Sequence, residues 1–280
     1  MILYRTKNDL AGHLDTLRGT GKEIGLVPTM GALHQGHFSL VEMSTALNQV
    51  TVVSIFVNPA QFNDPSDLAR YPRTLDRDLD LLKSHKVDVV FHPSVEEMYP
   101  EPDTRAFDLG GLDRLMEGVR RPGHFNGVAQ IVTRLFDVVR PHRAYFGRKD
   151  FQQLVIVRHL ARNLFPGIEI VACPVVREHD GLAMSSRNAL LGKKERKIAP
   201  RIYKILDQAR QRGRSMSPDQ VRNWVREQFD QIPEMDLEYY EIVEDKTLYP
   251  VSAWDDGVNN VGCIAALLGS VRLIDNLNFD

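Results

Sequence analysis

The stretch "GLVPTMGALHQGHFSLV", from Gly25 to Val41, indicates how the chain folds. It begins as a short apolar run of the kind that forms a buried strand, and it ends in a pattern that favours a helix. Between the two, His34 and His37 stand three residues apart around Gly36. A second apolar run, residues 51–57, follows the helical pattern, so this part of the chain predicts a β-α-β unit.

The alternation of apolar runs and helical patterns continues along the first 175 residues. Strands are expected at residues 23–28, 51–57, 87–91, 143–147 and 168–173. Helices are expected at residues 37–47, around 75–82, at 128–139 and at about 151–164. Strands that alternate with helices form a parallel sheet covered on both faces, and ligands bind beyond the carboxyl ends of its strands. The predicted fold class is α/β, with a Rossmann-like doubly wound parallel sheet at residues 1–175.

After about residue 175 the pattern changes. Two helical stretches, residues 194–212 and 218–231, precede three strand-like runs, "LEYYEIV", "VGCIAALL" and "SVRLID". Ser217 is a credible helix cap, and Pro218 suits the first position of the second helix. Residues 176–280 are therefore predicted to form a smaller α+β C-terminal domain.

The composition excludes several classes of protein. The chain has 280 residues, of which 43% are hydrophobic and 26% charged, with a formal net charge of -2 and so no broad basic face for a nucleic acid. No apolar run reaches the roughly 18 residues of a membrane helix, and the first residues lack the apolar block of a signal peptide. Cys173 and Cys263 fit no metal knuckle or disulfide framework and indicate buried residues in a reducing compartment. We expect a cytoplasmic protein that binds neither nucleic acid nor membrane.

The two histidines are the first candidates for a ligand site. Residues three apart at the start of a helix share a face, and Gly36 leaves room for a ligand to approach the backbone. Helix N-terminal N–H groups and two imidazoles suit a polyphosphate. The other interpretations are half of a metal site or a pair of surface histidines. Metal binding is disfavoured because no further His or Cys lies nearby in the sequence to complete a ligand set.

The motif "GLAMSSRN", residues 181–188, is a second candidate for phosphate binding. It offers two hydroxyls and a guanidinium in consecutive residues, Ser185, Ser186 and Arg187. The planar fork of arginine matches phosphate oxygens, and serines add neutral donors. A helix-capping serine followed by an exposed arginine is an equally good interpretation of these residues on sequence alone.

Two further motifs supply groups for other parts of a substrate. In "GRKD", Lys149 can neutralise charge on a phosphate, and Asp150 can accept hydrogen bonds from ribose hydroxyls. Gln61 and Gln153 carry amides that both donate and accept, which suits a small substrate with a hydroxyl and a carboxylate. An exposed ion pair and two surface glutamines are the alternatives.

Taken together, six motifs resemble the pantoate–β-alanine ligase family over essentially the whole chain. H-x-G-H alone marks a wider nucleotidyltransferase superfamily that includes class I aminoacyl-tRNA synthetases, whereas "VNPAQF" with "RPGHFNGV" is far more specific. The six motifs, in order, are "PTMGALHQGH", "VNPAQF", "YPRTLDRDL", "RPGHFNGV", "FGRKDFQQL" and "GLAMSSRN".

The resemblance implies a ligase that works in two half-reactions. The carboxylate of (R)-pantoate attacks the α-phosphate of ATP, which enters with Mg²⁺, and pyrophosphate leaves. The amine of β-alanine then attacks the acyl carbon of the bound pantoyl adenylate and releases AMP. The resemblance also implies that an N-terminal Rossmann-like domain binds ATP and pantoate, that the C-terminal domain is a hinged cover, and that the enzyme is a homodimer.

Residue roles follow from the resemblance position by position. The groups that would hold the phosphates and stabilise the transition state of adenylation are His34, His37, Lys149, Ser185, Ser186 and Arg187. Other contacts to ATP fall to Met30, Gly36, Gly147, Asp150 and Met184, and contacts to pantoate fall to Met30, Gln61 and Gln153. Four positions would line or order the pocket, namely Tyr71, Asp78, Glu117 and Arg121. One departure is Arg148, which stands where the family often has glutamate.

Three other functions compete with this one. A nucleotidyltransferase of the same superfamily would form a stable nucleotide conjugate instead of AMP and an amide. A tRNA-charging enzyme is disfavoured because no anticodon-binding extension or basic RNA face is evident. A nucleotide sensor would keep the pocket and bind ATP without turnover.

Overall fold

The computed structural model describes residues 1–255 and 257–279 and divides into two compact units. The first unit consists of Met1–Gly147 and Ile156–Cys173. The second unit consists of Arg148–Val155 and Pro174–Asp280. The chain therefore passes from the first unit into the second for one short segment before it returns.

The first unit is built on a sheet of six parallel strands, which confirms the predicted α/β class. The continuous apolar runs of the sequence form its buried central strands, since such runs suit a sheet covered on both faces. In spatial order the strands are β1 (Ile2–Tyr4), β4 (Val89–Phe91), β3 (Val50–Ile55), β2 (Ile24–Thr29), β5 (Arg143–Gly147) and β6 (Glu169–Cys173). The strand that leads to the two histidines thus lies in the middle of the sheet.

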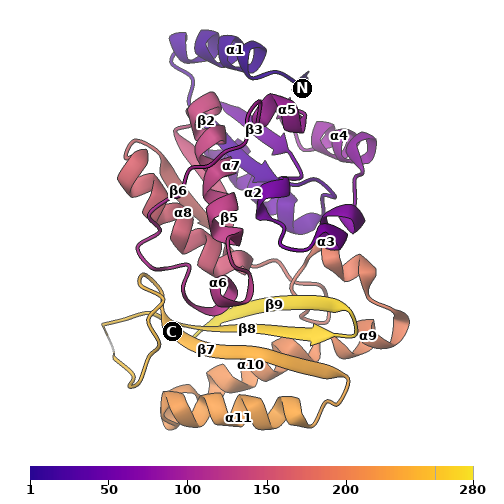
Figure 1. Ribbon diagram of the computed structural model, residues 1–280, viewed down its shortest axis with the longest axis vertical. Coiled ribbons are helices and arrows are strands. Elements are labelled where there is room, and N and C mark those ends of the chain that lie inside the picture. Colours follow the sequence, from indigo (N-terminus) through magenta and orange to yellow (C-terminus); the bar gives the residue numbers. More distant parts are fainter. Residues whose placement is uncertain (256, 280) are drawn as a thin grey trace. The chain divides into compact units, whose positions relative to one another are not determined.

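Helices surround the strands of this sheet (Figure 1). The helices are α1 (Lys7–Gly19), α2 (Gln35–Leu47), α3 (Pro65–Arg70), α4 (Leu75–Ser84), α5 (Val95–Met98), α6 (Met116–Arg120), α7 (His124–Val139) and α8 (Phe151–Leu164), with a 3-10 turn η1 (Pro59–Gln61). Helices α2 and α4 share an apolar cluster with residues of the central strands that include Val27, Val53 and Val90. The first turn of α8 belongs to the second unit.

The second unit has an antiparallel sheet of three strands, β7 (Met235–Glu244), β8 (Asn260–Leu268) and β9 (Val271–Asn278). Helices α10 (Arg201–Arg212) and α11 (Pro218–Asp230) pack along it over an apolar core (Figure 1). The remaining elements are the 3-10 turns η2 (Arg148–Asp150), η3 (Ser186–Leu190) and η4 (Gly213–Ser215) and the short helix α9 (Lys193–Ile198). This architecture confirms the predicted α+β character of the C-terminal part.

Two local expectations have different outcomes. Ser217 caps α11 in a capping box with Gln220, as the sequence predicts for this helix start. The single helix expected at residues 194–212 is wrong, because α9 ends at Ile198 and α10 begins at Arg201. Pro200 lies at the break, where its ring removes a backbone donor and disfavours a continuous helix. In the part of the chain that the structure describes, no helix is long and apolar enough to cross a membrane.

Candidate functional site

The two histidines lie against each other at the start of α2, with ring centroids 4.1 Å apart. The Nδ1 atom of His34 accepts the backbone N–H of Gly36 at 3.1 Å, and the Nδ1 atom of His37 accepts the backbone N–H of His34 at 3.3 Å. The imidazoles therefore form the capping box of this helix. Because both Nδ1 atoms accept, each neutral ring carries its hydrogen on Nε2 and can donate from there.

This geometry changes one expectation about the helix N-terminus. The backbone N–H groups of the first turn were expected to face a phosphate directly. Instead, the N–H of Gly36 is bound to the His34 ring, and the N–H of His37 is bound to the His34 carbonyl at 2.8 Å. The donors that this turn offers to a ligand are thus the imidazoles rather than these amides.

Asp78 holds the loop that carries the histidines. Its carboxylate oxygens accept the backbone N–H of Ala32 and of Leu33, each at 2.9 Å, and the hydroxyl of Thr74 at 3.1 Å. The side chain is buried, and Ala32 has a φ of 51°, a left-handed conformation that a residue with a Cβ rarely adopts. Asp78 thus holds the backbone of Ala32 and Leu33 in a conformation that is unfavourable at Ala32.

Gln61, at the end of η1, is held on both sides. Its side-chain nitrogen donates to the sulfur of Met30 at 3.0 Å, and its side-chain oxygen accepts from Asn58 at 3.3 Å. Its backbone carbonyl lies 2.7 Å from Nδ1 of His124 and 3.3 Å from Nη2 of Arg121. The structure thus brings together two residues predicted to contact pantoate, Met30 and Gln61, and gives Arg121 a part in holding their turn.

Gly127 allows helix α7 to approach this turn closely. A Cβ atom at Gly127 would lie 2.1 Å from the backbone oxygen of Ala60, a distance that real side chains do not reach. The Gly127 carbonyl also accepts from the side chain of Asn58 at 3.0 Å. The motif "RPGHFNGV" therefore contacts η1 through the His124 ring and the Arg121 guanidinium, and Gly127 leaves the space that this close approach requires.

A chain of polar contacts behind Asn58 has no counterpart in the motifs. The hydroxyl of Tyr99 donates to Asn58 at 2.8 Å, and Arg134 lies over the Tyr99 ring at 4.8 Å. Asp103 binds Arg134 and also Arg105, whose guanidinium lowers the pKa of that carboxyl well below its ordinary value. Burial raises the pKa of Tyr99 to about 12, so its hydroxyl stays a donor at neutral pH. These residues were missed because no local pattern joins positions so far apart in the sequence.

Of the remaining predicted residues of the first unit, Tyr71 and Glu117 are buried and Gly147 is partly exposed. Tyr71 follows α3 and meets the Phe62 ring edge-on at 5.7 Å between centroids, and Glu117 lies in α6 with 7% of its surface exposed. Gly147 ends β5, and a Cβ built on it would meet no atom within 4 Å. Open space above a strand end leaves room for a ligand to approach that backbone.

A cavity of about 550 Å³ opens at the carboxyl ends of β2, β3 and β4. Met30 and Asp78 are among its lining residues, together with apolar groups such as Phe56. Arg73 and Ser94 add a cation and a hydroxyl to the wall. The cavity lies at the carboxyl ends of the strands, which is where ligands bind in open α/β sheets. Its apolar, hydroxyl and cationic lining suits a small molecule with an apolar body and a carboxylate.

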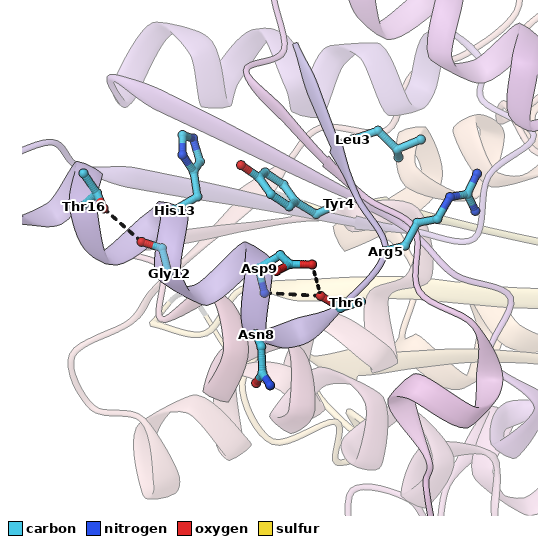
Figure 2. A pocket seen from close by; sticks show the side chains of 9 residues that line it. All are labelled: Leu3, Tyr4, Arg5, Thr6, Asn8, Asp9, Gly12, His13 and Thr16. Atoms are coloured by element: carbon cyan, nitrogen blue, oxygen red, sulfur yellow. Dashed lines mark hydrogen bonds between the residues drawn. The ribbon is translucent and has the colours of Figure 1, made fainter.

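A second hollow, of about 800 Å³, lies along β1 and α1, away from every predicted site residue (Figure 2). Figure 2 shows its contacts to be local, since Thr6 bonds Asp9 at the helix start and Thr16 bonds the Gly12 carbonyl. His13 stacks on Tyr4 there. We assign this open groove no ligand, and its residues serve below as controls.

The second unit holds the other predicted residues. Lys149 and Asp150 lie in η2, with Nζ and Oδ1 4.0 Å apart, so the ion pair considered for them exists in a loose form. Gln153 follows in α8 and is half-buried. The Arg148 guanidinium donates to the side chain of Asn278 on β9 at 2.6 Å. The residue that departs from the family pattern is thus bound to the antiparallel sheet.

The Ser185–Arg187 segment has the capping geometry that was its plainer interpretation. Ser185 caps η3 by accepting the backbone N–H of Arg187 at 3.3 Å. Met184 is held by a backbone bond to Val176, and Asn188 bonds Glu178 at 2.8 Å. A cap does not exclude a ligand, because the Ser185 hydroxyl keeps its own hydrogen to donate.

The predicted residues are divided between the two units. The first unit contains Met30, His34, Gly36, His37, Gln61, Tyr71, Asp78, Glu117, Arg121 and Gly147. The second unit contributes Lys149, Asp150, Gln153, Met184, Ser185, Ser186 and Arg187. That both groups act on one nucleotide stays a prediction. Among the described residues, no three His, Cys, Asp or Glu side chains are grouped so as to hold a metal ion.

Comparisons with known proteins agree with these motifs over the full length of the chain. The family model described as pantoate-beta-alanine ligase matches residues 2–278. A protein named pantothenate synthetase from Bacteroides thetaiotaomicron is 54% identical over 279 residues, covering 100% of this chain and 99% of its own. Its namesake from Porphyromonas gingivalis is 50% identical over 280 residues, with 100% of both chains covered.

Solved structures give the same result. The crystal structure of pantothenate synthetase from Thermus thermophilus matches with a TM-score of 0.93 and 45% identity, covering 100% of this chain and 99% of that one. A pantoate-beta-alanine ligase from Francisella tularensis, solved in complex with beta-gamma ATP and beta-alanine, matches with a TM-score of 0.83 and 34% identity, covering 100% and 98%. The chain therefore belongs to the pantoate–β-alanine ligase family.

Proposed function

We propose that the protein joins (R)-pantoate to β-alanine in an ATP-dependent reaction that yields pantothenate, AMP and pyrophosphate. The observation that carries the proposal is the family match over residues 2–278, together with a relative that is 54% identical across the whole chain. The complex of the Francisella relative with an ATP species and β-alanine supports the two co-substrates.

In the first half-reaction, a carboxylate oxygen of pantoate forms a bond to the α-phosphorus, and the bond to the β-phosphate oxygen breaks. Negative charge accumulates on the departing pyrophosphate. His34 and His37 donate from Nε2 to the phosphate oxygens, in agreement with the tautomer that their capping contacts require. Lys149, Ser185, Ser186 and Arg187 supply the remaining donors. Donors fixed before the reaction need no reorganisation as charge develops, which makes this type of stabilisation effective.

The substrates are oriented by side-chain amides and by the accessible backbone at Gly147. Gln61 presents an amide held by Asn58 and Met30, and with Gln153 it binds the hydroxyl and carboxylate of pantoate. The ribose is bound at Gly147 and Asp150, and Met30, Gly36 and Met184 contribute the other contacts to ATP. Orientation of two reactants can supply roughly 7 to 11 kcal/mol of the barrier.

In the second half-reaction, the neutral amine of β-alanine attacks the acyl carbon of pantoyl adenylate. The C–N bond forms, the bond between the acyl carbon and the AMP oxygen breaks, and the amine loses one proton to solvent. AMP leaves as the phosphate monoester. The exchange experiment below tests the adenylate intermediate.

Mg²⁺ fits this site as a companion of ATP rather than as a resident metal. His34, His37 and Gln61 offer imidazoles and an amide, whereas Mg²⁺ prefers carboxylate and phosphate oxygens, and the Asp78 carboxylate already accepts three hydrogen bonds. The phosphate chain would hold the ion, which would neutralise charge on the leaving pyrophosphate. A homodimer and a cytoplasmic location belong to the same proposal, and sedimentation velocity and cell fractionation test them.

The first experiment is pantoate-dependent exchange of labelled pyrophosphate into ATP, with Mg²⁺ present and β-alanine omitted. We expect exchange, because adenylation is reversible while the adenylate stays bound. Folded protein that binds ATP and gives no exchange would contradict the proposal. A stable nucleotide conjugate would favour a nucleotidyltransferase, and tight ATP binding without turnover would favour a sensor.

A further inference from the structure

Asn276 on β9 supports the backbone of the lysine turn η2. Its side-chain nitrogen donates to the carbonyl oxygen of Arg148 at 2.8 Å and to that of Lys149 at 2.9 Å. Asn276 is 4% exposed, and all three residues belong to the second unit. Both hydrogens of one buried amide are thus spent on two consecutive carbonyls of the turn.

The part of β9 that carries Asn276 is itself held firmly. Arg177 binds the Asp275 carboxylate with two bonds, at 2.6 and 3.0 Å, and donates to the Asn276 carbonyl at 3.2 Å. The same carboxylate accepts the Asn276 backbone N–H at 2.7 Å. Arg177 lies over the Tyr203 ring at 4.1 Å. Bidentate pairs of this kind fix orientation as well as distance, so Asn276 has little freedom to turn.

The charge of the lysine also reaches this network. Burial raises the pKa of Asp275, while the guanidinium of Arg177 and, more weakly, the ammonium of Lys149 act against that rise. The Asp275 carboxylate, which accepts the Asn276 backbone N–H, therefore also interacts electrostatically with the lysine that the turn carries.

Strand β9 also contacts the turn η3, which carries Ser186 and Arg187. Two segments that are far apart in the sequence are thus mounted on one strand of the second unit. Both segments carry groups that the proposed function places on the phosphates. Donors fixed on one rigid element keep their mutual distances without reorganisation.

We infer that Asn276 is a positioning residue for adenylation, which sets the place of Lys149 relative to Ser186 and Arg187 by holding two carbonyls of the lysine turn. The inference rests on the proposed function, because it assigns Asn276 a role through Lys149. The side-chain nitrogen of Asn276 donates to the turn, so the inferred role acts through Lys149. Its effect on the rate depends on the lysine, which distinguishes it from a residue that merely stabilises the fold.

The test is a double-mutant cycle of Asn276→Ala and Lys149→Ala, measured by pyrophosphate exchange at saturating ATP and pantoate. We expect N276A to lower kcat about 10- to 100-fold, since a displacement of 1 Å at a reacting group can cost about a hundredfold. In the K149A background the same change should alter the rate less than about threefold, because the group that it positions is gone. Asn223→Ala, at an exposed asparagine of α11, is the matched control and should behave as wild type.

The outcomes separate the inference from the proposed function. Wild-type rates in N276A, or an equal loss in both backgrounds, would overturn the positioning role and leave the ligase intact. If N276A does not fold, Asn276→Asp replaces it, because aspartate keeps the shape and cannot donate to the two carbonyls. Failure of both variants to fold would make Asn276 a residue of the fold and overturn the inference. An inactive wild type would contradict the proposed function. A fully active K149A would leave the ligase intact and remove Lys149 from its mechanism, and with it the basis of the inference.

Discussion

The carboxylate of Asp78 accepts the backbone N–H of Ala32 at 2.9 Å while Ala32 holds a left-handed φ of 51°. A conformation of this kind costs free energy that the surrounding contacts must supply. Because the loop leads within two residues to His34, the bond couples a buried carboxylate on α4 to the position of an imidazole. The position of the His34 ring, which the proposed function places on a phosphate, thus depends on a residue outside the histidine motif.

The variant Asp78→Asn tests this coupling. Asparagine has a single acceptor oxygen, so at least one N–H of the loop loses its partner. We expect the free energy of unfolding to fall by about 1 to 3 kcal/mol and pyrophosphate exchange to fall about a hundredfold. Denaturant melts and exchange rates measure the two effects. Asp80→Asn, at an exposed position of the same helix, should change neither, and equal losses in both variants would contradict the coupling.

His34 has two separable duties, as a helix cap and as a donor to phosphate. His34→Ala removes both, and we expect a loss of about 1 kcal/mol in stability and a fall in adenylation of at least about a hundredfold. His34→Asn keeps a capping oxygen and should regain the stability without the rate. Thermal melts and exchange assays separate the two. His13→Ala, in the groove of Figure 2, is the control, and an active His34→Asn would show that capping is the only duty.

Two helical glycines should respond in opposite ways to alanine. Gly127→Ala places a methyl group 2.1 Å from the Ala60 oxygen, so α7 and η1 must separate, at a cost of about 1 to 3 kcal/mol. Because η1 carries Gln61, KM for pantoate should rise. Gly12→Ala in α1 meets no atom within 4 Å and should stabilise the protein by about 0.5 to 1 kcal/mol. Urea melts that move both variants in one direction would refute this account.

Asp103 should make the stability sensitive to acid. Its pKa is lower in the folded protein than the value of about 3.9 in an unfolded chain, chiefly because Arg105 donates to it. The stabilisation is therefore fully present above about pH 4 and is lost as the pH falls further through the folded pKa. In Asp103→Asn, stability at pH 7 should fall by about 1 to 3 kcal/mol, and the loss between pH 4 and pH 2 should be smaller than in wild type. Urea melts across this range decide, and parallel acid profiles would contradict the prediction.

Long periodic segments were predictable because their signal is local. The strand at β2 and the helices α2 and α7 follow from apolar spacing that is repeated over many residues. Strand β1 was not predicted, since its three residues, Ile2–Tyr4, are too few for a periodic pattern and it pairs at the sheet edge with β4. The break before α10 was missed because the helical pattern on both sides of Pro200 is stronger than the signal of one proline.

The motifs predict candidate site residues, but they do not predict which groups hold those residues in place. His34, Gln61 and Lys149 stand in motifs that the sequence displays. Asp78 was also among the predicted pocket residues, but its partner Ala32 lies 46 positions away, and Asn276, which was not predicted, lies 127 positions from Lys149. Almost every residue has a backbone N–H and a carbonyl. The residue type therefore does not indicate which side chain binds those groups.

Because the chain is synthesised from its N-terminus, the segment Arg148–Val155 is made long before the strand that supports it. The parallel sheet is complete once β6 has left the ribosome, but the lysine turn between β5 and α8 must wait for β9, near the end of synthesis, before Asn276 can hold it. Formation of the parallel sheet and support of the lysine turn are therefore separate events during synthesis of the chain. A chain ended at residue 270 should keep a protease-resistant sheet and lose protection around Lys149, which limited proteolysis would detect. A chain whose parallel sheet has folded but whose strand β9 is not yet synthesised would still lack the bonds that support the lysine turn.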